Sequence, residues 1–201
     1  MGRKSKVDVR RKEILQTCYE LIESDGLEGI TLKKIGRKMG VAPSLIMHYF
    51  TNKEELIMAV VDYMLEKMDS VYIPRLSRFG TARERLEFFL DETINLYIAQ
   101  SVSDQVWYPC FALSLHDEKI RECFRRAYDR DLRMSRQLFS ELIDEEGLDG
   151  LDPDLLSAKL ISFVEGLNIL HAVYGMTDTF KSAIRNLKDD LLSVFDAMKD
   201  Q

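Results

Sequence analysis

The spacing of apolar residues constrains this chain more than any other feature of its sequence. Apolar side chains recur three or four positions apart almost from end to end, and the alternation typical of strands is absent. This period predicts amphipathic helices, with Gly and Pro falling between the helical segments rather than inside them. We therefore predict an all-α fold of about nine helices.

The length and composition predict a soluble globular protein. With 201 residues, 46% of them hydrophobic, the chain can bury a core without disulfides or a structural metal. Its three cysteines, Cys18, Cys110 and Cys123, are odd in number and far apart, which is typical of reduced thiols. No run approaches the ~18 apolar residues of a membrane span, and the charged start lacks the apolar core of a signal peptide. We expect a cytoplasmic protein.

Positive charge gathers at the N-terminus of a chain whose net charge is −6. Residues 1–53 contain 11 Lys and Arg against 6 Asp and Glu, whereas residues 54–201 contain 17 against 28. An acidic protein repels nucleic acid unless its cations share one surface. The basic segment is therefore either a DNA-binding surface or a solvated arm, and charge alone does not decide between them.

Residues 31–50 have the pattern of a helix-turn-helix. Thr31 predicts a helix start, Gly40 a sharp turn, and Pro43 the first position of a second short helix that ends near Tyr49. The apolar Val41, directly after the turn, is expected to lie between the two helices. In such a motif the second helix enters the major groove of DNA.

The residues in and around this motif resemble those of the TetR family of bacterial transcriptional regulators over about residues 8–60. The similar positions are Ile14, Leu15, Gly26, Thr31, Ile35, Gly40, Val41, His48, Tyr49, Phe50, Lys53, Glu55 and Leu56. The resemblance implies a three-helix DNA-binding head, a helical ligand-binding body and a homodimer formed by the last two helices. It also implies a repressor that binds a palindromic operator and leaves it when a small molecule binds.

Three positions depart from the family pattern. Ala42 stands where the family usually has Ser or Thr, so the reading helix should lack a side-chain cap, a loss of about 1 kcal/mol. Leu45 and Met47 stand where the family often has threonine and tyrosine. They exchange hydroxyl contacts for apolar ones, which suit thymine methyl groups.

The resemblance assigns nine candidate DNA-binding residues. Thr31 is expected to bind a phosphate through its hydroxyl and helix-start amide. The candidates that supply phosphate charge are Lys33, Arg37 and Lys53, those that face the groove are Pro43, Ser44, Met47 and His48, and the last, Tyr49, offers its hydroxyl to a phosphate. The alternatives are that Tyr49 and Phe50 pack the head and that His48 is an unpartnered surface residue. The arm with Arg3, Lys4, Lys6 and residues 10–12 either adds charge in the minor groove or only solubilises the chain.

We predict three segments. Residues 1–52 form the arm and the helix-turn-helix domain, residues 53–80 a connecting helix, and residues 81–201 a helical ligand-binding and dimerisation domain. Capping boxes formed by Asn52 with Glu55 and by Thr81 with Glu84 open two of the helices, and Asp152 caps a third.

Two sets of residues are candidates for a small-molecule site. Aromatic residues gather around a short helix interrupted by Pro109, and polar residues recur at i, i+3 and i+6 on an otherwise apolar helix. The candidates are Trp107, Tyr108, Phe111, Phe124, Glu165, Asn168 and His171. An apolar cavity with a few convergent polar groups is typical of a ligand site, although each of these residues also suits a plain core.

The last two predicted helices, residues 153–175 and 177–199, carry apolar residues in a repeating 4-3 spacing. This seam predicts shallow-angle packing against a neighbouring helix, which belongs either to a second subunit or to the chain's own core. The candidate dimer-interface residues are Leu156, Leu160, Phe163, Leu167, Phe180, Ile184, Leu187 and Leu191.

Enzymatic motifs are absent from the sequence. There is no Gly-rich phosphate loop, no zinc motif and no nucleophile elbow, and His48, His116 and His171 lie far apart. We therefore predict a ligand-responsive transcriptional regulator without catalytic residues, metal or cofactor, whose partners are operator DNA, a small-molecule effector and a second copy of the chain. The alternative is a helical adaptor or a cofactor-independent enzyme that does not bind DNA.

Overall fold

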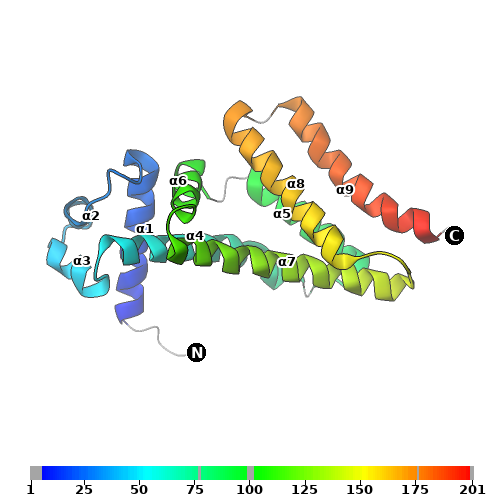
Figure 1. Cartoon of the computed structure of the whole chain (residues 1–201). Helices are drawn as coiled ribbons and strands as arrows, with labels where there is room; N and C mark the ends of the chain where they lie inside the picture. Colours follow the sequence, from blue (N-terminus) through cyan, green and yellow to red (C-terminus); the bar gives the residue numbers. More distant parts are fainter. Residues whose placement is uncertain (1–5, 77, 99–101, 176, 200–201) are drawn as a thin grey trace. The chain divides into compact units, whose positions relative to one another are not determined.

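The structure of the protein is a computed structural model that describes residues 6–76, 78–98, 102–175 and 177–199. Within these ranges all regular secondary structure is helical, as predicted (Figure 1). The helices are α1 (Lys6–Asp25), α2 (Leu32–Met39), α3 (Pro43–Tyr49), α4 (Lys53–Leu76), α5 (Ala82–Ile98), α6 (Asp104–Ser114), α7 (Glu118–Glu146), α8 (Pro153–Tyr174) and α9 (Asp178–Lys199).

The structure defines the ends of two helices and corrects one expectation. Helix α1 begins at Lys6 and places Asp8 in its first turn, where the helix dipole favours a negative charge. Helix α4 ends at Leu76, two residues after Pro74. The helix around Pro109 is not interrupted, because α6 runs through this proline to Ser114.

Both predicted capping boxes are present. At the start of α4 the Glu55 amide donates to Asn52 Oδ1 at 2.8 Å, and Glu55 Oε2 accepts from the Thr51 amide at 2.7 Å. At the start of α5 the Glu84 amide donates to Thr81 Oγ1 at 3.2 Å, and Glu84 Oε2 accepts from the Thr81 amide at 3.1 Å. These bonds lower the pKa of both glutamates, chiefly because each carboxylate accepts from a backbone N–H.

The chain divides into two compact units, and each is described by itself. Unit 1 comprises Met1–Met68 and Val102–Arg126, and unit 2 comprises Asp69–Ser101 and Ala127–Gln201. This division differs from the predicted segments, because α6 and the start of α7 belong with the head. One contact that holds them there is the bond from the Ser103 amide to the Tyr19 hydroxyl at 2.8 Å.

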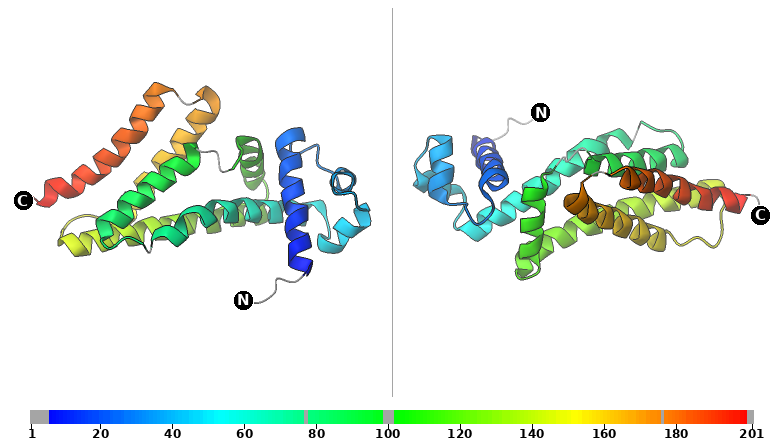
Figure 2. Two further views of the ribbon diagram at one scale, coloured as in Figure 1. Left: turned by 180° about the vertical axis from the view of Figure 1, so that it is seen from behind. Right: turned by 90° about the horizontal axis from the view of Figure 1, so that it is seen from above.

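Unit 1 has a closed core shared by α1, α2, α3 and the first part of α4. The views in Figure 2 show α2 and α3 beside α1, and α2 packs against both of the other helices. The side chains buried to 1% exposure or less include Ile14, Cys18, Ile22, Ile30, Ile35, Ile46, Phe50, Leu56, Val60, Val61 and Met64. The predicted DNA-binding head, which we define as α1, α2, α3 and the first part of α4, therefore has a complete hydrophobic core within one chain.

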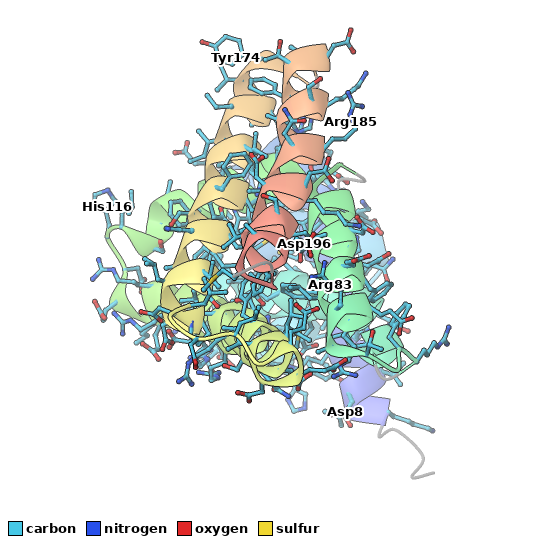
Figure 3. The ribbon with its side chains drawn as sticks, turned by 90° about the vertical axis from the view of Figure 1, so that its right-hand side faces the viewer. Asp8, Arg83, His116, Tyr174, Arg185 and Asp196 are labelled. Atoms are coloured by element: carbon cyan, nitrogen blue, oxygen red, sulfur yellow. The ribbon has the colours of Figure 1, made fainter. Side chains whose placement is uncertain are left out.

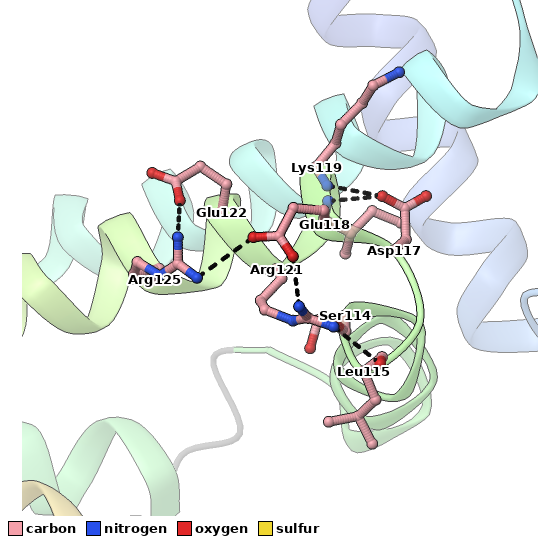
Figure 4. Close-up of polar contacts among 9 residues, drawn as sticks. Ser114, Leu115, Asp117, Glu118, Lys119, Arg121, Glu122 and Arg125 are labelled. Atoms are coloured by element: carbon pink, nitrogen blue, oxygen red, sulfur yellow. Dashed lines mark hydrogen bonds and ion pairs between the residues drawn. The ribbon is translucent and has the colours of Figure 1, made fainter.

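The connection between α6 and α7 is fixed by polar contacts (Figure 4). Arg121 donates to the carbonyl oxygens of Ser114 and Leu115, at 2.9 and 3.0 Å, and so satisfies the end of α6. Asp117 Oδ1 accepts from the amides of Lys119 and Ile120, at 2.9 and 3.2 Å, and caps the start of α7.

Unit 2 buries its core between α5, the later part of α7, the first half of α8 and the end of α9. Phe139 and Phe195 stack at its centre with ring centroids 6.0 Å apart. Arg83 on α5 donates to Glu146 at 2.9 Å and to Asp196 at 2.6 Å, and Figure 3 shows Arg83 beside Asp196. The core also contains Ala82, Leu86, Phe89, Leu90, Leu138, Leu142, Leu148, Leu156, Leu160, Val164 and Leu191.

The candidate dimer-interface residues of α8 and α9 are not all exposed on the surface of the single chain. Leu156, Leu160 and Leu191 are buried in the core of unit 2 within a single chain, so they offer little surface to a partner, and their place in a dimer interface stays a prediction. Leu167, Phe180, Ile184 and Leu187 are half-buried, and Phe163 is exposed. The sequence spacing found the apolar helices but did not separate the face turned to the core from the face left open.

The open apolar surface lies mostly on the second half of α8. We call this surface, formed by exposed Phe163, Ile169, Leu170, Val173 and Tyr174, the α8 patch. The core of unit 2 covers the first half of α8 and stops at Val164, which explains why the later residues remain exposed. Figure 3 shows Tyr174 at one end of the α8–α9 pair and Asp196 near the other.

By length and composition α8 is also able to cross a membrane, although the sequence analysis predicted no such span. It has 22 residues and a mean hydropathy of 1.3 over an 18-residue window, of which 22% is buried. A helix that packs against protein passes the same test, so length and composition alone do not assign this helix to a bilayer.

Candidate nucleic-acid interface

The predicted helix-turn-helix is formed by α2, a tight turn and α3. Thr31 has an extended backbone, and its hydroxyl oxygen accepts from the Lys34 amide at 3.1 Å, which caps α2. Gly40 ends α2 in the left-handed region, at φ 68°, which a residue with a side chain rarely adopts. Thr31 and Gly40 thus have the local roles that the sequence predicted for them.

Gly36 is a residue that the sequence analysis missed. It is buried inside α2, and the Val41 amide donates to its carbonyl oxygen at 2.9 Å. A Cβ atom at this position would lie 2.7 Å from the Val41 carbonyl oxygen, so only glycine allows the turn to pass this close to the helix. A glycine inside an amphipathic helix was the signal available in the sequence.

The cations of α2 divide into two pairs. Lys34 binds Asp25 at 3.1 Å and Lys38 binds Glu20 at 2.9 Å, so both are held against α1. Lys33 and Arg37, four residues apart, share another face of the helix. Both are exposed, and neither has an ion-pair partner within the part of the chain that the structure describes. Their charges are therefore available to phosphate groups.

The candidate residues of α3 share one exposed face. Pro43, Ser44, Met47 and His48 are all exposed, Met47 to 56%, whereas Ile46 on the opposite face is completely buried. The helix thus anchors on its apolar side and leaves its predicted reading side open. As expected for an alanine at the start, Ala42 makes no side-chain capping bond.

The end of α3 is held from inside the head. Phe50 is 1% exposed and packs in the core of the head, in line with the structural role that the sequence analysis gave as its alternative. Tyr49 is half-buried, with its ring edge-on to His48 at 5.5 Å. Arg11 on α1 donates from Nη1 to the Tyr49 carbonyl oxygen at 3.2 Å, and its guanidinium lies 4.4 Å from the centre of the Phe50 ring. The sequence analysis placed Arg11 only in a basic arm.

The remaining basic candidates lie at the first turns of α4 and α1. Lys53 is exposed at the start of α4 and makes no ion pair with any residue that the structure describes. Lys6 and residues 10–12 belong to α1 rather than to an extended arm. Arg3 and Lys4 lie outside the described residues.

The aromatic ligand-site candidates come together in unit 1. Trp107 and Phe111 on α6 both meet the Phe124 ring edge-on, with ring centroids 5.2 and 5.5 Å away. Phe124 is 2% exposed, whereas Trp107, Tyr108 and Phe111 are half-buried. Trp107 and Phe111 therefore pack on the buried Phe124 ring and remain partly accessible themselves.

The polar ligand-site candidates belong to unit 2. Glu165, Asn168 and His171 are half-buried along α8. A groove of about 500 Å³ lies in unit 1 between Arg11, the first turns of α4 and the start of α7, with Met58, Ala59 and Cys123 among its lining residues. None of the seven predicted ligand-site residues lines this groove, so their joint role stays a prediction.

The fold, the turn and the exposed face of α3 define a helix-turn-helix regulator, and comparison with protein families identifies the class. A family model for the C-terminal domain of BetI-type transcriptional repressors matches residues 82–196, and a model for bacterial regulatory proteins of the tetR family matches residues 14–60. The chain belongs to the TetR family. It is a DNA-binding transcriptional regulator and not an enzyme or an adaptor.

Among curated proteins, the chain is similar to the HTH-type transcriptional regulator BetI of Escherichia coli strain UMN026. The two are 25% identical over 139 residues, which cover 68% of each chain. Among solved structures, a putative transcriptional regulator from Pseudomonas aeruginosa PAO1 matches with a TM-score of 0.82 and 17% identity, covering 96% of this chain and 93% of that one.

Two further solved structures share the fold. A putative transcriptional regulator from Saccharomonospora viridis in complex with choline has a TM-score of 0.76 and 21% identity, covering 92% of this chain and 96% of that one. A TetR transcription regulator from Haloarcula marismortui has a TM-score of 0.79 and 20% identity, covering 95% of this chain and 98% of that one. At these identities the likeness establishes the fold.

Proposed function

We propose that the protein is a cytoplasmic repressor that binds a palindromic operator as a homodimer and leaves it when a small molecule binds. The observation that carries this proposal is the exposed face of α3, with Ser44, Met47 and His48, together with exposed cations of α2 and α4 that have no ion-pair partner among the described residues. Side chains on such a face reach base edges in the major groove, and the cations neutralise phosphates.

The phosphate contacts come from Thr31, Lys33, Arg37 and Lys53. The Thr31 hydroxyl accepts from the Lys34 amide, and its own proton remains free for a phosphate oxygen. A helix N-terminus such as that of α2 also attracts anions. The three exposed cations fix the register of the head on the duplex, whereas Lys34 and Lys38 stabilise the head through their ion pairs with α1.

A second copy of the chain covers the α8 patch. Five large apolar side chains on half of one helix form a surface that soluble monomers rarely leave open. A twofold dimer brings the same patch of both copies together. Two heads held in this way reach two half-sites about one DNA turn apart, or a multiple of it, which is why the operator is palindromic.

The effector is a small organic molecule, and its candidate contacts are tested separately in each unit: the aromatic set Trp107, Phe111 and Phe124 in unit 1, and the polar groups of α8 in unit 2. Because a structural neighbour was solved in complex with choline, a quaternary ammonium compound is the first class to test. The faces of aromatic rings attract such cations. Choline should therefore raise the melting temperature, and its neutral isostere 3,3-dimethylbutan-1-ol should not; saturation at 100 times Kd adds about 2.7 kcal/mol of stability.

The placement of the effector is tested by variants of the predicted site. Asn168→Ala and His171→Ala should reduce the ligand-induced rise in melting temperature, and if both leave it intact these two residues do not contact the effector. Trp107→Leu tests the aromatic candidates in the same assay. Equal shifts with choline and its neutral isostere would contradict recognition of the positive charge.

Release from DNA follows from a shift between two conformations. Helix α4 begins in unit 1 and ends in unit 2, so a ligand that changes the tilt of α4 changes the spacing of the two heads. Nearly complete switching requires a ligand that prefers the released state about 10⁴-fold, or about 5.5 kcal/mol. A weaker preference gives partial release.

Selection of bound sequences from random DNA tests the central part of this function. The expected product is a palindrome whose half-sites lie one or two helical turns apart, bound with an affinity that falls steeply with salt. Recovery of a single half-site would contradict the proposal that the two heads of a dimer bind the operator together. Recovery of no preferred sequence would contradict base reading by α3.

A further inference from the structure

The reading helix α3 receives little support from its own ends. It has seven residues, its N-cap residue Ala42 makes no side-chain capping bond, and its C-cap residue Phe50 is extended rather than a left-handed glycine. Isolated helices of this length are unstable in water, and the orphan carbonyl groups at a helix end need partners. The orientation of α3 must therefore be fixed by contacts from other helices.

Arg11 on α1 supplies two such contacts at the C-terminal end of α3. Its Nη1 donates to the carbonyl oxygen of Tyr49, the last residue of the helix, at 3.2 Å. Its guanidinium lies over the ring of Phe50, 4.4 Å from the centroid, and Phe50 is buried in the core of the head. A cation at a helix C-terminus also interacts favourably with the helix dipole.

From these contacts we propose that Arg11 is a positioning residue for base reading. It does not touch DNA, but it ties the end of α3 to α1 and so holds Met47 and His48 at the angle that the major groove requires. This inference rests on the proposed reading role of α3. The neighbouring Arg10 differs, because it pairs with Glu13 on its own helix at 2.7 Å and makes no described contact with α3.

The two arginines provide a matched test. Arg11→Met and Arg10→Met each remove one positive charge and the same hydrogen-bond donors, at positions one residue apart. Arg11→Lys keeps the positive charge and an N–H donor but loses the planar guanidinium. The measurement is the Kd for the selected operator and for a scrambled duplex, each over a range of salt concentrations. Positioning changes the ratio of the two affinities, whereas a phosphate contact changes the salt slope.

Arg11→Met should weaken operator binding about tenfold relative to Arg10→Met, the loss expected for a hydrogen bond from a charged donor. Binding to the scrambled duplex and the salt slope should match those of Arg10→Met. Arg11→Lys should recover part of the operator affinity. Equal weakening on both duplexes, or a slope that falls by about 0.9 relative to Arg10→Met, would overturn the proposal.

A second readout reports on the helix itself and does not depend on DNA. The Phe50 amide donates to the Ile46 carbonyl oxygen at 3.0 Å, which makes it a probe of the end of α3. In hydrogen-exchange experiments this amide should exchange faster in Arg11→Met than in Arg10→Met, while amides of α5 remain unchanged. Unchanged exchange at Phe50 would overturn the positioning role. If the wild-type protein shows no sequence preference, the proposed reading function fails, and this exchange experiment still decides the role of Arg11.

Discussion

The head and the second half of α8 use apolar residues in opposite ways. In the head, Ile35 and Ile46 are completely buried within one chain, and the exposed candidates are polar or charged apart from Pro43 and Met47. On α8, Ile169 and Val173 are exposed to 54% and 71%. The comparison shows that the type of side chain left exposed, rather than the overall hydrophobicity of a region, distinguishes a surface suited to phosphates from one suited to another protein.

The largest expected effect is on the α8 patch. Val173→Glu places a charge on an exposed apolar position, so it should leave the fold of the single chain intact and prevent dimerisation. Two heads that act independently lose the gain of joint binding, which is about 10²–10⁴-fold. Light scattering should give the mass of one chain, and a mobility-shift assay should show operator binding weakened at least 100-fold.

The matched control is Ala112→Glu, which adds the same charge at an exposed position of α6. This variant should remain a dimer with nearly normal operator binding. If Val173→Glu also remains a dimer, the α8 patch is not the dimer interface.

The next largest effect is expected on the stability of the head, at the place where Gly36 of α2 lies against Val41 of the turn. Gly36→Ala places a Cβ atom 2.7 Å from the Val41 carbonyl oxygen, and this overpacking should lower the free energy of unfolding by about 1–3 kcal/mol. Gly80→Ala is the control in unit 2, where the nearest atom would be 3.9 Å away, and its stability should change little. Denaturant unfolding compares the two, and equal stabilities would contradict the packing described for the head.

A smaller effect is expected on the reading face of α3. Met47→Ala removes an exposed side chain, so the stability of the head should not change. Loss of one apolar base contact should reduce discrimination between the operator and a scrambled duplex by about 1 kcal/mol, the low end for a base contact, with the same salt slope. An unchanged ratio of the two affinities would remove Met47 from the reading face.

A still smaller change is expected in the salt dependence of DNA binding, because some lysines of the head are ion-paired with α1 and others are not. Lys53→Ala should weaken binding to all sequences alike and flatten the salt slope by about 1. Lys34→Ala removes the same charge from a lysine that is paired with Asp25, so it should leave the slope nearly unchanged. Equal slopes for the two variants would mean that pairing within the head does not decide which cations reach DNA.

The smallest effects concern the capping boxes, which occur in both units. The folded pKa values of Glu55 and Glu84 are lowered, so each charged carboxylate stabilises the fold above its unfolded pKa, and this stabilisation is lost as pH falls through the lowered folded pKa. Glu55→Gln and Glu84→Gln should therefore melt slightly below the wild type at pH 7. The difference should disappear in acid, as measured by circular dichroism, and a difference that grows in acid would contradict the assignment.

The head was predicted from the sequence in more detail than the body, for a physical reason. Gly40, Thr31 and the capping boxes act through contacts a few residues away, so their roles are visible in short sequence windows. Arg11 acts on Tyr49 and Phe50 across 38 residues, and no local pattern predicts such a contact. Gly36 was missed because its constraint is the approach of Val41, which depends on the folded turn.

In the body, the 4-3 spacing predicted two amphipathic helices but not their orientation. Leu156 and Leu160 follow the same spacing as Phe163 and Leu170, yet the first two are buried and the last two exposed. The difference arises because the core of unit 2 ends along α8, which depends on where α5, α7 and α9 pack. For the same reason the spacing could not decide which polar residues of α8 line a ligand site.

Hydroxyl-radical footprinting of side chains tests both halves of the account in one experiment. In the free protein at micromolar concentration, Leu170 and Tyr174 should be protected by a partner copy although both are exposed in the single chain, whereas Met47 and His48 should react freely. Addition of operator DNA should protect Met47 and His48 and leave the α8 patch unchanged. A reactive α8 patch in the free protein, or a reading face that stays reactive on the operator, would contradict the account.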